Sequence, residues 1–190
     1  MESFVIYTPE SANDAASGIL QDIREKIGFA PNMFAVMGGA PAALTAFVEM
    51  NRAVTRSRFD PTEAEIIQTA ASVANLSPYC VAGHTAFAAM QQVDAGTIAA
   101  VRREDELTDA RHEALRRFTQ RLVESRGHMR EQEIAAFIDA GFDRDAAIEV
   151  IMVVALKFFS NLVGNMTNIP LDDAFARFEW KPETSPAVAA

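Results

Sequence analysis

Three residues of this 190-residue chain have types and a spacing that could do thiol chemistry. Cys80 is the single cysteine, His84 follows it four residues later, and Glu65 lies fifteen residues before it. A thiolate is a strong nucleophile, and an imidazole can take its proton or pass one to a leaving group. A carboxylate can orient that imidazole or move protons itself. The pattern therefore predicts an activated site in which Cys80 is the nucleophile, His84 the base and Glu65 the orienting acid.

Two predicted helices have to position these side chains. Residues 60–63 (Asp-Pro-Thr-Glu) match a helix start, with Asp60 as N-cap and proline in the first turn. Good helix formers follow over residues 64–74, and Asn75 and Leu76 interrupt them. Ser77 then offers a second N-cap, again followed by a proline, so a new helix is predicted to begin at residue 78.

This second helix start places Cys80 at the third helical position. The free backbone N–H groups and the positive end of the helix dipole stabilise a thiolate there. His84 lies one turn further on the same face. If the preceding helix folds back antiparallel, the carboxylate of Glu65 can reach His84.

The pattern resembles the alkyl hydroperoxidase D / carboxymuconolactone decarboxylase family. Redox members carry Glu, eleven residues, Cys-x-x-Cys, three residues and His, and Glu65, Cys80 and His84 match this spacing. Ser77 stands where the first cysteine of the motif belongs, and Tyr79 occupies an inner position that is often His. The missing thiol means that an internal disulfide cannot form within one chain.

The resemblance extends over about residues 29–172, including a Pro-Asn-aromatic segment at 31–34 and the stretch 169–172. It implies an all-α, single-domain compact helical bundle of the alkyl hydroperoxidase D-like type. It also implies Cys80, His84 and Glu65 as catalytic residues, with Ser77 and Tyr79 in support. Family members assemble as trimers or hexamers, so a homo-oligomer is expected. The high apolar content, 49% of residues, agrees with subunit interfaces.

Each of these residues also has a plainer interpretation. A lone cysteine is most often a small buried hydrophobe, His84 could be a polar core residue, and Glu65 could be a surface charge. Ser77 could cap the helix, hydrogen-bond the thiolate, or both. Tyr79 could be a pocket wall, which we favour, or a proton donor.

Composition excludes several classes of protein. A net charge of −9 argues against nucleic acid and anionic membranes as partners. One cysteine rules out a disulfide framework within the chain and suits a reducing cytoplasm. The N-terminus lacks a basic signal-peptide region, and the apolar run 151–159 contains Lys157 and is too short to span a bilayer.

No dinucleotide, P-loop or serine-hydrolase motif is present. We therefore expect no cofactor, and no metal.

No segment alternates strictly enough to demand a sheet, so the chain is predicted to be all-α. Residues 1–28 form an extension and first helix, 29–180 the helical domain, and 181–190 a disordered tail. A turn is expected at 164–171, after the last long helix. The predicted helices cover residues 13–26, 31–39, 41–55, 60–74, 77–91, 93–102, 109–125, 131–140 and 143–163.

Three functional hypotheses follow. The first is a thiol peroxidase that reduces hydroperoxides through Cys80 and is regenerated by an external thiol reductant or a second subunit. The second is a non-redox decarboxylase-like lyase acting on a small organic acid, with acid–base work near His84 and Glu65. The third is a catalytically silent helical oligomer that binds a small ligand.

Overall fold

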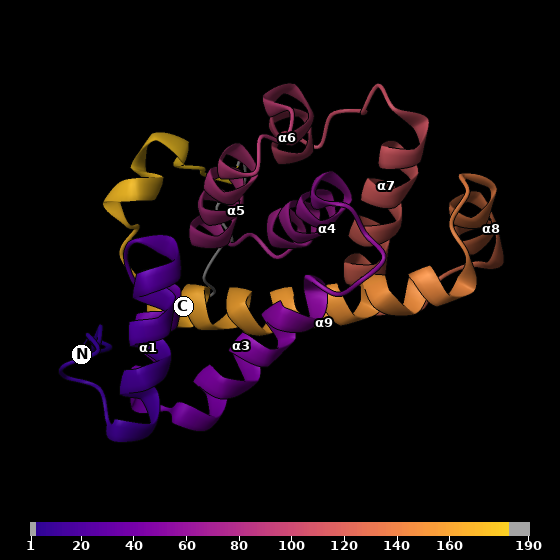
Figure 1. Cartoon of the computed structure of the whole chain (residues 1–190). Coiled ribbons are helices and arrows are strands. Elements are labelled where there is room, and N and C mark those ends of the chain that lie inside the picture. The colour runs from indigo at the N-terminus through magenta and orange to yellow at the C-terminus, as the bar shows by residue number, and fades with distance from the viewer. Residues whose placement is uncertain (1–2, 183–190) are drawn as a thin grey trace, which may run out of the picture.

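The computed structural model describes residues 3–182, and these residues form helices and no strand (Figure 1). The predicted all-α class is therefore confirmed. Residues 183–190, most of the predicted tail, lie outside the described residues. The elements are α1 (Asp14–Ile27), α2 (Asn32–Ala35), η1 (Val36–Gly39), α3 (Pro41–Val54), α4 (Pro61–Ala74), α5 (Pro78–Met90), α6 (Ala95–Arg102), α7 (Ala110–Glu124), α8 (Glu131–Asp139), α9 (Arg144–Thr167) and η2 (Asp173–Phe178), where η denotes a 3-10 helix.

Short acidic or amide side chains begin most of the longer helices. The side chain of Asp60 accepts a hydrogen bond from the backbone N–H of Glu63, and Glu63 reaches back to the N–H of Asp60. This capping box satisfies two donors that the first turn would otherwise leave free. The predicted start of α4 is thus confirmed. The other side-chain N-caps are Asn13, Asp94, Asp109 and Asp143.

Helix α4 is the central element of the bundle. It packs against α5, α6, α7 and α9, and it lies between them in Figure 1. Most of its residues are buried, including the polar side chains of Glu65, Gln68 and Ser72. A helix that is buried all round cannot leave such groups unpaired cheaply, so they must find partners inside the protein.

Helix α9 crosses beneath α4 and α5, with α3 on its other side, and reaches α7 and α8 at its far end (Figure 1). It continues to Thr167 and ends at Asn168, which is in the left-handed conformation with φ 46°. The predicted turn at 164–171 was therefore wrong in its first half. Gly164 therefore lies inside α9 and does not end it. A glycine suits this position because α2 passes close by: a Cβ there would lie 3.2 Å from Cε of Met33.

By length and composition α9 could also cross a membrane, with a mean hydropathy of 1.9 over its most apolar stretch. The core helix of a helical bundle meets the same criterion, and α9 packs on α3, α4, α5 and α7. One such helix is weak evidence for a membrane span. Its interior also carries Lys157, which is buried and paired within the bundle.

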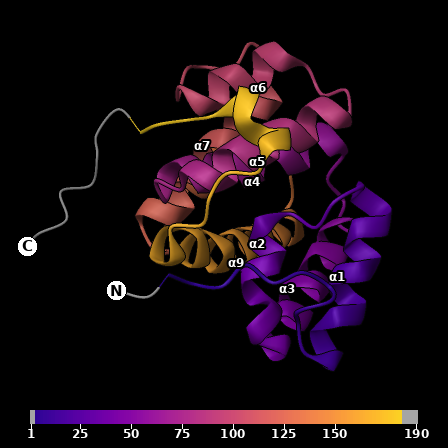
Figure 2. The same cartoon turned by 90° about the vertical axis from the view of Figure 1, so that its left-hand side faces the viewer.

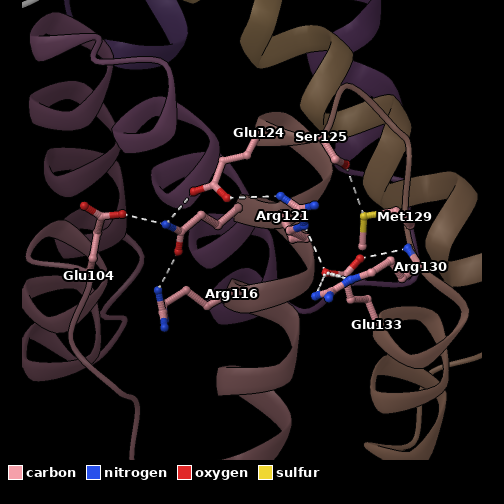
Figure 3. A network of polar contacts seen from close by, with 9 residues as sticks. Glu104, Arg116, Arg121, Glu124, Ser125, Met129, Arg130 and Glu133 are labelled. Atoms are coloured by element: carbon pink, nitrogen blue, oxygen red, sulfur yellow. Dashed lines mark hydrogen bonds and ion pairs between the residues drawn. The ribbon is translucent and has the colours of Figure 1, made fainter.

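Surface ion pairs connect α7 to α8 at the end of the molecule away from α1 (Figures 1 and 3). Nε of Arg121 on α7 lies 2.9 Å from Oε1 of Glu133 on α8, and Arg130 pairs with the same carboxylate. These contacts, first that with Arg130, lower the pKa of Glu133 to about 2. Exposed pairs of this kind contribute little stability each. Here they connect the short helix α8 to α7 and so help to orient it.

The C-terminal segment η2 lies across α5, as the turned view shows (Figure 2). Phe175 is buried there, with its ring 5.5 Å from that of Phe87 and 6.1 Å from that of Tyr79. At the other end of the chain, the N–H of Tyr7 donates to the carbonyl of Ala35. Segment η2 therefore packs on the helix that carries Cys80 and His84, whereas Tyr7 packs on α2 and η1.

Candidate active site

Helix α5 begins as the sequence predicted. Ser77 is its N-cap in an extended conformation, Pro78 is the first helical residue, and Cys80 is the third. The cysteine is free and only 4% exposed. Its sulfur is therefore in the opening turn of a helix, where the dipole favours an anion.

Ser77 does not cap the helix with its side chain. Its hydroxyl makes no N-terminal hydrogen bond and is buried without a hydrogen-bond partner among the described residues. The side-chain cap expected from sequence is thus corrected. A serine at an N-cap usually turns its oxygen to the first N–H groups, whereas here the close approach of α9 surrounds it: the hydroxyl oxygen lies 3.7 Å from where a Cβ on Gly164 would be.

The thiol of Cys80 has a hydrogen-bond partner on α9 rather than on its own helix. Its sulfur donates to Oγ of Ser160 at 3.9 Å, and Ser160 in turn donates to the backbone carbonyl of Lys157 at 3.2 Å. The sequence pattern allows His84, one turn along α5, to take the thiol proton or to pass one to a leaving group. In this structure its two ring nitrogens pair with Glu65 and Lys157, and the thiol of Cys80 bonds to Ser160.

Glu65 and His84 do meet across the α4–α5 contact. Nδ1 of His84 lies 2.9 Å from Oε2 of Glu65, and the amide of Gln91 donates to Oε1 of the same carboxylate at 2.8 Å. Both carboxylate oxygens are therefore held, and the carboxylate fixes the plane of the imidazole. Because Glu65 is 4% exposed, its pairing with His84 also satisfies a group that burial would penalise.

Lys157 completes this chain of polar groups from the opposite side. Its Nζ lies 2.6 Å from Nε2 of His84, and the residue is 3% exposed. The carboxylate of Glu65 requires a proton on Nδ1, so Nε2 of a neutral His84 accepts a hydrogen bond from the amine. Glu65, His84 and Lys157, here called the relay, thus connect α4, α5 and α9.

Burial governs the protonation of the relay. It lowers the pKa of His84 from 6.5, the charge of Lys157 lowers that pKa further, and Glu65 partly opposes both. Burial also lowers the pKa of Lys157 from 10.5, against the opposing influence of Cys80 and Glu65. Two positive charges 2.6 Å apart in a dry interior are unfavourable, so the imidazole and the amine hold at most one between them.

Tyr79 serves the packing around the site. Its hydroxyl donates to Oδ2 of Asp172 at 2.5 Å and accepts the N–H of Met33 at 3.1 Å. Burial, followed by the contact with Asp172, raises the pKa of Tyr79, and burial raises the pKa of Asp172 as well. The engaged hydroxyl fits the pocket-wall interpretation of Tyr79 better than that of a proton donor.

A small cavity of about 50 Å³ is bordered by Cys80, His84 and Lys157, with Tyr79 among its other lining residues. A larger open groove of about 840 Å³ runs between α1, α3, α4 and α5. The two spaces share four lining residues: Phe34, Asn51, His84 and Phe87. A small reacting group could therefore occupy the cavity while an apolar substituent extends into the groove.

Sequence reasoning missed Lys157, Gln91 and Ser160 as parts of this site. Lys157 was visible as the one charge in the apolar run 151–159, and a charge in such a run is rarely buried without a partner. Nothing in the local sequence identified that partner, because His84 is 73 residues away.

The family model described as the carboxymuconolactone decarboxylase family matches residues 25–120, half of the chain, including Glu65, Cys80 and His84. The chain belongs to this family. No curated protein matches it.

Solved structures similar to this family member share its fold. They include a peroxidase-related alkylhydroperoxidase D core protein from Ralstonia eutropha JMP134, 21% identical with a TM-score of 0.81 over 90% of this chain and 93% of that one. A peroxidase-related protein from Silicibacter sp. TM1040 is 20% identical with a TM-score of 0.78 over 92% of each chain. A cysteine-to-alanine variant of the debrominase Bmp8 in complex with 2,3,4-tribromopyrrole is 19% identical with a TM-score of 0.77 over 94% of this chain and 96% of that one. The predicted alkyl hydroperoxidase D-like fold is confirmed.

Residues 3–182 of this family member contain no group of three or more His, Cys, Asp or Glu side chains that could hold a metal ion. The pair of Glu65 and His84 cannot be extended to such a set at the second ring nitrogen, because the amine of Lys157 occupies it. We assign no metal to the site.

The buried amine predicts a pH-dependent stability. Between its lowered pKa and the ordinary value of 10.5, the unfolded chain binds a proton at Lys157 that the native chain does not. The free energy of unfolding of the wild type should therefore rise with pH through this window relative to that of Lys157→Met. Urea titrations of both proteins from about pH 7 to pH 10.5 measure the difference, in which titrating groups distant from Lys157 cancel. A difference that is flat over this range would show that the amine is as easily protonated in the native protein as in water.

Proposed function

We propose that this protein is a peroxidase-type thiol oxidoreductase that reduces hydroperoxides through Cys80. The observation that carries the proposal is the shared cavity: Cys80, in the first turn of α5, lines the same small space as His84 and Lys157. A nucleophile and a proton-carrying pair around one space is the arrangement that peroxide reduction needs.

The reaction balances as follows. The Cys80 thiolate attacks the terminal oxygen of the hydroperoxide, the O–O bond breaks, and sulfur is oxidised to a sulfenic acid while the peroxide is reduced to an alcohol. The proton lost by the thiol ends on the departing alkoxide. His84 and Lys157, 2.6 Å apart at the cavity wall, can hold this proton between them, and Glu65 keeps the imidazole in the required tautomer.

The two spaces favour an organic hydroperoxide with an apolar substituent as the substrate. A cavity of about 50 Å³ admits the peroxide group, and the groove beyond Phe34 and Phe87 offers an apolar surface to the rest of the molecule. The similarity to a debrominase complex adds halogenated pyrroles as a second compound class to assay.

Regeneration has to come from outside the motif, because Ser77 replaces its first cysteine. We propose that an external thiol, of the kind a reducing cytoplasm supplies, or a second subunit returns Cys80 to the thiol.

A second candidate is a non-redox lyase acting on a small organic acid. The hydrogen bonds favour it in one respect: the relay of Glu65, His84 and Lys157 is complete without Cys80, whose thiol bonds to Ser160 instead. In that case the Lys157 ammonium would bind the substrate carboxylate and His84 would move the proton.

We also propose a homo-oligomer, a trimer or a hexamer, in which copies meet along α9. Five large apolar side chains on this helix, here called the α9 stripe, are 45–70% exposed. Their spacing of three, seven, four and four residues puts them on one face of the helix. Exposed apolar rows of this kind mark protein contacts. The α9 stripe consists of Ile148, Ile151, Phe158, Leu162 and Met166.

The thiol mechanism predicts that Cys80→Ala abolishes reduction of tert-butyl hydroperoxide and that His84→Gln lowers kcat/KM by about 100-fold or more, the usual contribution of a proton-transfer group. Consumption of peroxide, followed by an iron–xylenol orange assay in the presence of dithiothreitol, measures both effects. Ser125→Ala, on the far side of the molecule at the end of α7, serves as the matched control and should keep full activity. Turnover of an organic acid that survives Cys80→Ala would favour the lyase.

The motif alignment predicts that Ser77→Cys restores an internal disulfide. Position 77 is buried at the N-cap three residues before Cys80, and its hydroxyl has no hydrogen bond to lose. After peroxide treatment, intact-mass analysis with a thiol-alkylating reagent should find no free thiol in this variant. Two alkylated cysteines would show that the two positions do not face each other.

The proposed assembly predicts that Leu162→Glu, between Phe158 and Met166 in the α9 stripe, shifts the protein from oligomer to monomer. A buried carboxylate at a subunit contact is unpaired and strongly unfavourable. Light scattering after size-exclusion chromatography measures the mass. Val5→Glu, at an exposed apolar residue outside the stripe, should leave the oligomer intact. A wild-type protein that runs as a monomer at micromolar concentration would remove the proposal.

A further inference from the structure

The cavity beside Cys80 is also lined by the amine of Lys157, a potential nucleophile that the proposed peroxidase cycle uses only to hold a proton. Lys157 lines the same space of about 50 Å³ as Cys80. The two residues are also joined through α9: the sulfur donates to the hydroxyl of Ser160, and that hydroxyl donates to the carbonyl of Lys157. The sulfur therefore lies against the turn of α9 that carries the amine.

The other neighbour that could react with an oxidised Cys80 is unsuited to the task. Ser77 occupies the place of the missing thiol, but a hydroxyl is a far weaker nucleophile toward sulfur than a thiolate or an amine. An amine attacks only through a free lone pair, which a buried lysine keeps more readily than an exposed one. Here burial lowers the pKa of Lys157, and the ring nitrogen of His84 is placed to receive a proton from it.

We propose that Lys157 is the resolving nucleophile of the cycle, whose amine condenses with the sulfenic acid of Cys80 to form a covalent sulfenamide between α5 and α9. The inference rests on the proposed peroxidase function, because it begins from the sulfenic acid that a hydroperoxide produces.

The step balances in atoms and electrons. The lone pair of Nζ attacks the sulfur, the S–O bond breaks, and hydroxide leaves with the bonding electron pair. Nε2 of His84 accepts the proton that the nitrogen loses and passes it to the hydroxide, so that the products are the sulfenamide and water. No further oxidant is consumed, because sulfur keeps the oxidation state that it had in the sulfenic acid.

The sulfenamide has two chemical consequences. It withholds the sulfur from a second peroxide, which would otherwise carry the sulfenic acid on to the irreversible sulfinic acid. An external thiol then attacks the sulfur, releases the amine of Lys157 and leaves a mixed disulfide, and a second thiol restores Cys80. The lysine would thus do within one chain what the first cysteine of the motif does elsewhere.

Mass spectrometry of the intact wild type after one equivalent of tert-butyl hydroperoxide tests the proposal. The expected product is lighter than the reduced protein by two hydrogen atoms, with a proteolytic peptide linking Cys80 to Lys157 and full reversal by dithiothreitol. The chain has only three lysines, so the linked one is easily assigned. Lys157→Met, in which His84 alone remains to carry the proton, should instead gain one oxygen atom, more slowly, and react with dimedone at Cys80; with excess hydroperoxide it should proceed to the sulfinic acid. Lys181→Met, an exposed lysine paired with Glu179, is the matched control and should behave as the wild type.

The outcomes separate this inference from the proposed function. A wild type that gains one oxygen atom, reacts with dimedone and yields no linked peptide would overturn the role of Lys157 and leave peroxide reduction by Cys80 in place. Cys80 that remains a free thiol after peroxide treatment would overturn both. If Lys157→Met does not fold, the peptide map of the wild type decides the question alone.

Discussion

The structure depends on one buried polar contact, that between the amine of Lys157 and the imidazole of His84. A lysine inside a helical bundle has to be neutralised or paired, because removing its charge from water costs several kcal/mol. Lys157 meets that requirement through His84, and His84 meets its own through Glu65. Three helices from separate parts of the chain are thereby fixed in one relative position. Leaving either end of the relay unpaired would cost about 1–3 kcal/mol per group.

The same contact explains why the site is asymmetric. The small cavity is lined by two members of the relay, His84 and Lys157, and by the aromatic residues Phe34, Phe87 and Phe175. Because Lys157 and Glu65 are buried, charges in the relay interact more strongly than they would in water. The sulfur enters this space from the first turn of α5, where the helix itself favours negative charge. Chemistry at Cys80 would thus use the electrostatics of the fold as well as the side chains beside it.

The helix start at Asp60 could be predicted because capping is local: an acceptor side chain, a proline and an acidic residue follow one another in the sequence. The start at residue 78 could be predicted because a proline favours the first helical position. The meeting of Glu65 with His84 could be anticipated for a related reason, since the two helices are consecutive and fold back on each other. Lys157 could not be placed, because the contact joins residues 73 positions apart and depends on how α9 crosses the bundle. The failed expectation for the Ser77 hydroxyl has the same origin, since only the packed structure shows α9 pressed against it.

The glycine at position 164 determines how closely α9 can approach the first turn of α5. A methyl group there would meet Cε of Met33 at 3.2 Å, Oγ of Ser77 at 3.7 Å and Cβ of Tyr79 at 4.0 Å. Three separate segments of the backbone therefore converge where one carbon atom is missing. An alanine would need only a shift of a few tenths of an ångström at the end of Met33, whereas a residue larger than alanine would have to push α9 away from α2 and α5; because α9 also carries the amine, the gap between nitrogen and sulfur would then widen. The distance between the reactive nitrogen and sulfur thus depends on a glycine that carries neither atom.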